Sequence, residues 1–132
     1  MSGRFITATQ ADHEQLEWGA LKWFSRPETT GAKDLVVIEV NIEPGYGHDF
    51  HKHPDQEEVI YVLEGSIEQW LEQGSQTLTP GDSVFIPADV VHASFNTSDS
   101  VAKLFVVLGP SVGAEGYQLV DVSDEAPWNS LR

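Results

Sequence analysis

From Lys33 onward, short apolar runs alternate with breaks that are rich in Gly, Pro, Asn, Asp and Ser. Runs of roughly four to eight residues bounded in this way are typical of β-strands. The strands are predicted at residues 20–24, 35–42, 47–53, 57–63, 66–71, 76–79, 83–86, 91–96, 101–108 and 117–122. Many short strands at even spacing indicate a closed barrel or sandwich. We therefore predict an all-β fold that forms one domain over residues 1–132.

Helical character is confined to the N-terminal part of the chain. Residues 8–18 are the one stretch that resembles a helix, and the stretch is short. The expected addition to the β-fold is therefore a short N-terminal helix or arm.

Two of the predicted strands are apolar on both faces, at residues 35–38 and 59–63. A strand with one solvated face alternates between polar and apolar residues, so both faces of these strands are expected to be covered. The cover is either the N-terminal segment with Trp18, Trp23 and Phe24, or a second subunit. We favour a homodimer. The alternative is a single-chain sandwich that buries both faces internally.

The charge of the chain excludes several kinds of partner. Seven Lys and Arg residues stand against 21 Asp and Glu residues, and the formal net charge is −14. Such a charge repels phosphate backbones and anionic lipids, so we expect no nucleic-acid partner and no membrane partner. The absence of Cys excludes thiolate chemistry. The first twenty residues contain no apolar block of the kind found in signal peptides, and we expect a cytoplasmic protein.

Four of the five histidines lie in two of the predicted strand regions, and three of these four are candidate metal ligands. His51 and His53 are two residues apart, which places both side chains on one face of a strand. Glu57 and Glu58 follow shortly after them, and His92 begins a later strand. Brought together inside a barrel, three imidazoles and a carboxylate would bind a divalent first-row metal ion. Taken singly, each of these residues is more often a surface charge or a hydrogen-bonded histidine.

Two longer patterns contain these residues in order. The segment GYGHDFHKHPDQEEVIYVLEG runs from Gly45 to Gly65, and GDSVFIPADVVHASFN runs from Gly81 to Asn96. The two segments resemble the two sequence motifs of the cupin family. One position departs from the pattern, because Asp89 replaces a glycine that is usual in the second motif. Asp tolerates left-handed backbone geometry, so we expect the turn to be kept.

The resemblance implies a double-stranded β-helix, which is a small jelly-roll barrel of two antiparallel sheets. It also implies His51, His53, Glu58 and His92 as the ligands of one divalent transition metal ion, with Fe, Mn, Ni, Zn, Co and Cu all compatible. Glu57 competes with Glu58, because the family tolerates either spacing. Glu58 is favoured, because it keeps the usual distance to Gly65.

The resemblance further implies a small-molecule ligand inside the barrel, in a pocket that we expect to be largely apolar. We expect a metal-dependent dioxygenase that acts on a small enol, diketone or flavonol-like substrate. The alternatives are a non-catalytic ligand-binding or sensor protein, and a metal-dependent isomerase or sugar-modifying enzyme. No catalytic residue beyond the ligands is assigned. The polar side chains considered for the surroundings of the metal are His48, Asp49, Ser94, Asn96 and Lys103.

Overall fold

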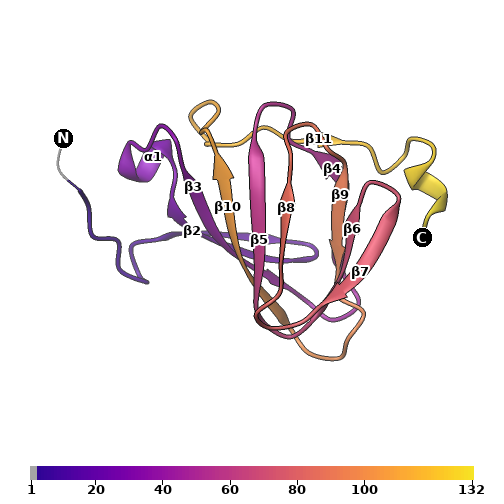
Figure 1. Ribbon diagram of the computed structural model, residues 1–132. Coiled ribbons are helices and arrows are strands. Elements are labelled where there is room, and N and C mark those ends of the chain that lie inside the picture. Colours follow the sequence, from indigo (N-terminus) through magenta and orange to yellow (C-terminus); the bar gives the residue numbers. More distant parts are fainter. Residues whose placement is uncertain (1–2) are drawn as a thin grey trace.

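The computed structural model describes residues 3–132, which form two antiparallel β-sheets and very little helix (Figure 1). The larger sheet has the strand order β1-β2-β3-β10-β5-β8, and the smaller sheet has the order β11-β4-β9-β6-β7. This architecture confirms the predicted all-β class. The elements are β1 (Asp12–Leu16), β2 (Gly19–Ser25), α1 (Pro27–Thr30), β3 (Val36–Ile42), β4 (Gly47–Lys52), β5 (Glu57–Glu64), β6 (Ile67–Leu71), β7 (Gly74–Leu78), β8 (Ser83–Ile86), β9 (His92–Phe95), β10 (Ala102–Gly109), β11 (Val120–Asp121) and a 3₁₀ turn, Trp128–Ser130.

The main core lies between the two sheets. In β3 and β10, every second residue is buried, and the paired strands present these residues to the same side. Ile67 and Leu78 of the smaller sheet join the same core. The inner face of the paired strands β5, β10 and β3 is therefore apolar, and it packs against the smaller sheet.

The N-terminal region differs from its prediction, because residues 12–16 form strand β1 and not a helix. This strand forms a hairpin with β2, in which Asp12 pairs with Trp23 and Leu16 pairs with Gly19. The Arg26 guanidinium also binds the Asp12 carboxylate at 2.9 Å. Helix propensity in this polar segment is weak, and pairing with the sheet overrides it. The only α-helix within residues 3–132 is the single turn α1.

The C-terminal segment covers the outer face of the smaller sheet. Only Val120–Asp121 of the predicted strand 117–122 is extended, as β11 beside β4. The chain then crosses the sheet, where it completes a second apolar cluster (Figure 1). The cluster consists of Phe50, Val91, Ala93, Phe95 and Val122, with Trp70, Trp128 and Leu131 packed against them.

The outer face of the larger sheet remains exposed. Val59 and Tyr61 of β5 are each 40% exposed, and Phe85 of β8 is 54% exposed. The N-terminal segment is not the cover that the sequence suggested, because Trp23 points into the core and is 1% exposed. The single-chain alternative, with both faces buried internally, is therefore wrong for this sheet. No helix in residues 3–132 has the length and apolar character needed to cross a membrane.

Candidate metal centre

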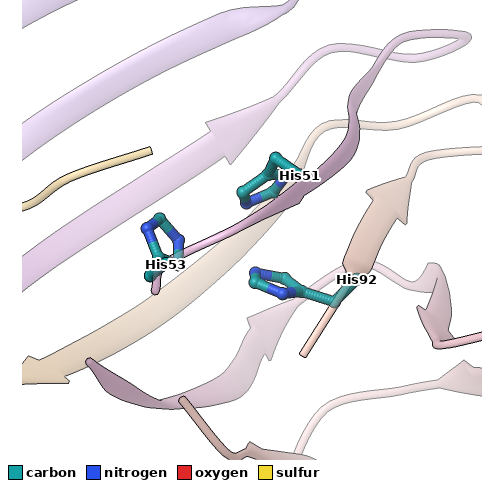
Figure 2. Close-up of side chains that lie close together, drawn as sticks. All are labelled: His51, His53 and His92. Carbon is teal, nitrogen blue, oxygen red and sulfur yellow. The ribbon is translucent and has the colours of Figure 1, made fainter. Parts of the chain in front are cut away.

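Strands β4 and β9 bring three histidines together. His51 on β4 is the register partner of His92 on β9, and His53 lies two residues after His51, at the end of β4. Their side chains point toward one another from the smaller sheet (Figure 2). One ring nitrogen from each histidine can be chosen so that all three lie within 4.8 Å of one another. All three residues are buried. The site could therefore hold a metal ion.

Glu58 approaches the histidines from the opposite sheet. Its Oε1 lies 2.9 Å from His92 Nε2 and 3.3 Å from His53 Nε2. Strand alternation places Glu58 on the inner face of β5 together with Ile60, and it places Glu57 on the exposed outer face. The structure thus brings together all four residues expected from the sequence, and it separates Glu57 from them.

The backbone fixes the orientation of each imidazole ring. The Nδ1 atoms lie within hydrogen-bond distance of three carbonyl oxygens, at 2.6 Å for His51 with Asp49, 2.8 Å for His53 with Gln118 and 3.0 Å for His92 with Val90. A carbonyl only accepts, so Nδ1 carries the proton in each ring. Each Nε2 of a neutral ring then presents its lone pair. Histidines that bind metals are commonly held in this way.

Among residues 3–132, four buried side-chain polar atoms lack a well-aligned hydrogen bond, and two of them belong to this site. These two are Oε1 of Glu58 and Nε2 of His92. Buried polar atoms without partners are rare in proteins, and such atoms often mark an ion. Three imidazole nitrogens and one carboxylate also suit a divalent transition metal ion, so the residues fit the group that the sequence predicted.

The electrostatics of the metal-free site favour a charged pair. Burial alone would raise the pKa of Glu58, but the nearby His92 and His53 rings hold it below its ordinary value. Burial alone would lower the pKa of His92, but Glu58 raises it. Burial lowers the pKa of His51 strongly, and neighbouring His48 lowers it further. Glu58 and His92 thus each favour the charged form of the other.

The four residues lie at one end of a cavity of about 240 Å³. Pockets for drug-sized ligands span roughly 300–1,000 Å³, so this cavity would enclose a small molecule or one end of a larger one. The walls are mostly aliphatic, as predicted, and come from the inner face of the larger sheet. They comprise Leu16, Leu21, Ile38, Val40, Ile42, Ile60, Leu104, Val106 and Leu108.

Aromatic side chains reach the cavity from outside the two motifs. Aromatic residues close to the motifs in sequence, such as Phe85 and Phe95, lie on the outer faces of the sheets, where they pack or remain exposed. The cavity is instead lined by Trp18, from the β1–β2 turn, and by Tyr117. Trp18 stacks on His48 with ring centroids 4.8 Å apart, and His48 stacks on His51 at 3.7 Å.

Two of the five polar candidates face the cavity. His48 lines it, and burial lowers the pKa of His48 to about 4. Ser94 also lines it, and its hydroxyl donates to Gln69 Oε1 at 2.6 Å. The lone pairs of Ser94 are therefore free to accept a hydrogen bond from a ligand.

The other three polar candidates have structural roles. Asn96 is buried but donates to the carbonyl oxygens of Ile42 and Ser100. Lys103 lies on the outer face, 3.9 Å from Glu64. Asp49 accepts a hydrogen bond from the Phe50 amide at 2.7 Å. In the second motif, Asp89 has a φ of 67°, so the left-handed turn is kept.

Sequence reasoning missed three residues around the site. Glu14 on β1 and Tyr117 line the cavity, and Gln56 lies buried beside the ligands. Glu14 and Tyr117 are far from the motifs in sequence, and nothing local marks them. For Gln56 a signal did exist, because it is an uncharged polar residue between two predicted ligands.

Comparison with known proteins relates the chain to one family. The family model described as "Cupin domain" matches residues 38–108. Protein SchB of Streptomyces halstedii is 35% identical over 92 residues, which cover 70% of this chain and 67% of SchB. Polyketide synthase CurC of Streptomyces cyaneus is 29% identical over 127 residues, which cover 96% of this chain and 81% of CurC. Quercetin 2,3-dioxygenase of Bacillus subtilis is 34% identical over 62 residues, which cover 47% of this chain and 18% of that protein.

Solved structures share the fold. The polyketide cyclase RemF from Streptomyces resistomycificus superposes with a TM-score of 0.73 at 23% identity, and the match covers 96% of this chain and 90% of RemF. A protein with a double-stranded β-helix domain from Klebsiella pneumoniae superposes with a TM-score of 0.69 at 20% identity, over 91% of this chain and 99% of that protein. The two antiparallel sheets therefore form a double-stranded β-helix, as the two motifs implied.

Proposed function

Because the chain belongs to the cupin family, we propose that it is a metal-dependent enzyme acting on an enolisable small molecule with several carbonyl groups, of the polyketide type. The observation that carries the proposal is the convergence of three Nε2 atoms and Glu58 at the end of an apolar cavity. The reaction that we favour is an intramolecular condensation, in which a carbon–carbon bond closes a ring and water is lost. The similarity to CurC over 96% of the chain supports this substrate class.

His51, His53, Glu58 and His92 would hold the metal. A bound divalent ion supplies Lewis acidity, which polarises carbonyl oxygens and makes the neighbouring C–H groups more acidic. One carboxylate and three neutral imidazoles would leave a net positive charge on a divalent ion.

The remaining cavity residues would bind and orient the substrate. The aliphatic walls would hold the carbon skeleton of the substrate and exclude water. Because water is excluded, polar interactions inside the cavity become stronger. Ser94 accepts a hydrogen bond from an enol or phenol hydroxyl group. His48 stays neutral at pH 7, since its pKa is about 4, so it offers a flat uncharged surface and not a second cation.

A second candidate is the oxygen-dependent cleavage of an enol or flavonol, as the sequence motifs led us to expect. The similarity to quercetin 2,3-dioxygenase over the motif region supports this candidate. Imidazole and carboxylate donors suit iron as well as zinc, so both reactions use the same ligand set.

The test separates metal binding from turnover. Metal-free protein would be reconstituted anaerobically with Fe(II), Mn(II), Ni(II) or Zn(II), and bound metal would be measured by elemental analysis. Each form would then be mixed with a linear tri- or tetraketide surrogate and with a flavonol, with and without oxygen. An oxygen-independent product lighter by one water supports condensation, and substrate-dependent oxygen uptake supports the second candidate. Ligand binding without product would indicate a sensor, and failure to bind any metal would remove the basis of the proposal.

A homodimer is proposed for the exposed face of the larger sheet. The part of this face formed by β5 and the edge strand β8 is apolar, with Val59, Tyr61 and Phe85 exposed. Most of its charges are paired, because Lys22 pairs with Glu39 in the β2–β3 register and Lys103 lies beside Glu64, while Glu57 on β5 adds one negative charge. A second copy can therefore approach this face without the repulsion expected from a net charge of −14.

The cytoplasmic location expected from the sequence stays a prediction.

A further inference from the structure

The segment 110–118, which we call the strap, connects β10 to the C-terminal part of the chain and passes the metal centre. We propose that Gln56 is a positioning residue that seats this strap, and that the seated strap orients His53 and closes one side of the cavity. The proposal rests on the metal-binding part of the proposed function.

Gln56 is buried and uses both ends of its side-chain amide on the strap. It is 1% exposed. Its Nε2 donates to the carbonyl oxygens of Pro110 at 2.7 Å and Gly116 at 2.9 Å. Its Oε1 accepts from the backbone amide of Gln118 at 3.2 Å. One side chain thus satisfies three backbone groups at both ends of the strap.

The strap in turn contacts the metal centre at two points. The carbonyl oxygen of Gln118 accepts from Nδ1 of His53 at 2.8 Å, and this contact fixes the tautomer and the tilt of the ring. Tyr117 places its ring 5.9 Å from the His53 ring and 5.3 Å from the Trp23 ring. Gln118 therefore joins the two interactions, because its amide binds Gln56 while its carbonyl binds His53.

Few other hydrogen bonds hold this part of the strap. Ser111 binds the carbonyl oxygens of Lys33 and Leu35 at the start of the strap, and Val112 binds Gly116 within it. Among the hydrogen bonds of residues 3–132, those from Gly116–Gln118 to the barrel run to the side chains of Gln56 and His53. Loss of Gln56 should therefore release Gln118 and leave the Nδ1 proton of His53 without its acceptor.

Gly116 offers an independent way to lift the strap. Its φ is +95°, and an added Cβ would lie 2.9 Å from Val36 Cγ2 and 3.0 Å from Pro27 Cδ. An alanine there would be strained by its backbone conformation and would also collide with its neighbours. Gly116→Ala should thus displace the strap without any change to Gln56.

The experiment compares Gln56→Leu and Gly116→Ala with Gln69→Leu. Gln69 is the matched control, because it is 3% exposed and its bonds run to Ser94 and to the backbone of Trp70, away from the strap. Three quantities would be measured: amide hydrogen exchange of residues 112–118, the NMR signal of the His53 Nδ1 proton in metal-free protein, and the affinity for Co(II) in competition with a chelator.

The expected result is faster exchange in the strap, loss of the His53 Nδ1 signal and Co(II) binding weaker by about tenfold or more in both test variants, the range typical of lost outer-shell partners. Gln69→Leu should keep all three properties of the wild type, although it lowers overall stability. Unchanged strap exchange in Gln56→Leu would overturn the proposal, and so would a released strap with wild-type Co(II) affinity. If the wild type binds no Co(II), the proposed function fails, and the exchange and NMR data still decide whether Gln56 seats the strap and orients His53.

Discussion

Oε1 of Glu58 lies 2.9 Å from Nε2 of His92, and the two residues come from opposite sheets of the barrel. Neither atom has a well-aligned hydrogen bond, although both are buried. This arrangement is costly for a structural ion pair, because each group keeps an unsatisfied lone pair or proton in a dry site. It suits an ion placed between the two groups.

Glu58→Gln should weaken metal binding by about tenfold or more, because the amide removes the negative charge that offsets the charge of the ion. Glu57→Gln is the matched control, since it changes the neighbouring residue on the exposed face of the same strand. Isothermal titration calorimetry with Zn(II) measures the metal affinity of each metal-free variant. If Glu57→Gln were the weaker binder, the carboxylate ligand would be displaced by one residue.

His51→Ala and His92→Ala should each lose the bound equivalent of metal and remain folded. The main core contains neither histidine, so the barrel keeps most of its stabilising contacts. We expect the free energy of unfolding of the metal-free protein to fall by about 1–3 kcal/mol. After purification, elemental analysis measures the bound metal, and circular dichroism shows whether each variant is folded. A full equivalent of metal in either variant would contradict the ligand assignment.

The metal-free protein should lose stability as the pH falls from about 6.5 to about 4, and His48 should contribute to this loss. Burial lowers the pKa of His48 from 6.5 to about 4, so the unfolded chain takes up a proton in this range that the folded chain refuses. His48→Phe keeps a ring between Trp18 and His51 but cannot be protonated. Urea unfolding at successive pH values should give a flatter pH dependence for this variant, and an unchanged slope would exclude His48 as a source.

Phe85→Glu on the exposed face of the larger sheet should convert a dimer into a monomer of 14.6 kDa. A charge within an apolar interface would be buried without a partner. Leu119→Glu serves as the control, because Leu119 is 37% exposed and lies outside the strands of that sheet. Light scattering after size-exclusion chromatography gives the masses. A wild-type protein that is already monomeric would contradict the homodimer proposal.

Most strands could be predicted from the sequence, because β-strand signals are local. Apolar runs bounded by turn residues mark β3, β5 and β10, and the structure keeps their boundaries to within one or two residues. Strand β2 of the N-terminal hairpin could be predicted too, at residues 20–24, but its partner β1 could not. Its polar residues carry little strand signal, and the close approach of Gly19 to the Asn41 carbonyl in the next strand exists only in the folded sheet.

The side chains at the centre of the site could also be predicted, because spacing along β4 and β5 decides which of them face inward. The environment of the site depends on topology instead. Trp18 and Tyr117 come from opposite ends of the sequence and meet the histidines only when the sheets close. The sequence did not show on which face of its strand the Lys103 side chain lies. The register of β10 with β3 and β5 places this side chain on the outer face of the sheet.

The cavity is assembled from two unequal portions of the chain. The histidines, Glu58 and most of the aliphatic wall lie within residues 38–108, the region that the cupin family shares, whereas Glu14, Leu16, Trp18, Leu21 and Tyr117 lie outside it. Under the proposed function, the residues that would bind the metal and many of those that would contact the substrate are therefore encoded in different parts of the chain. Changes in the hairpin β1–β2 or in the strap would reshape the cavity and leave the four candidate ligands in place.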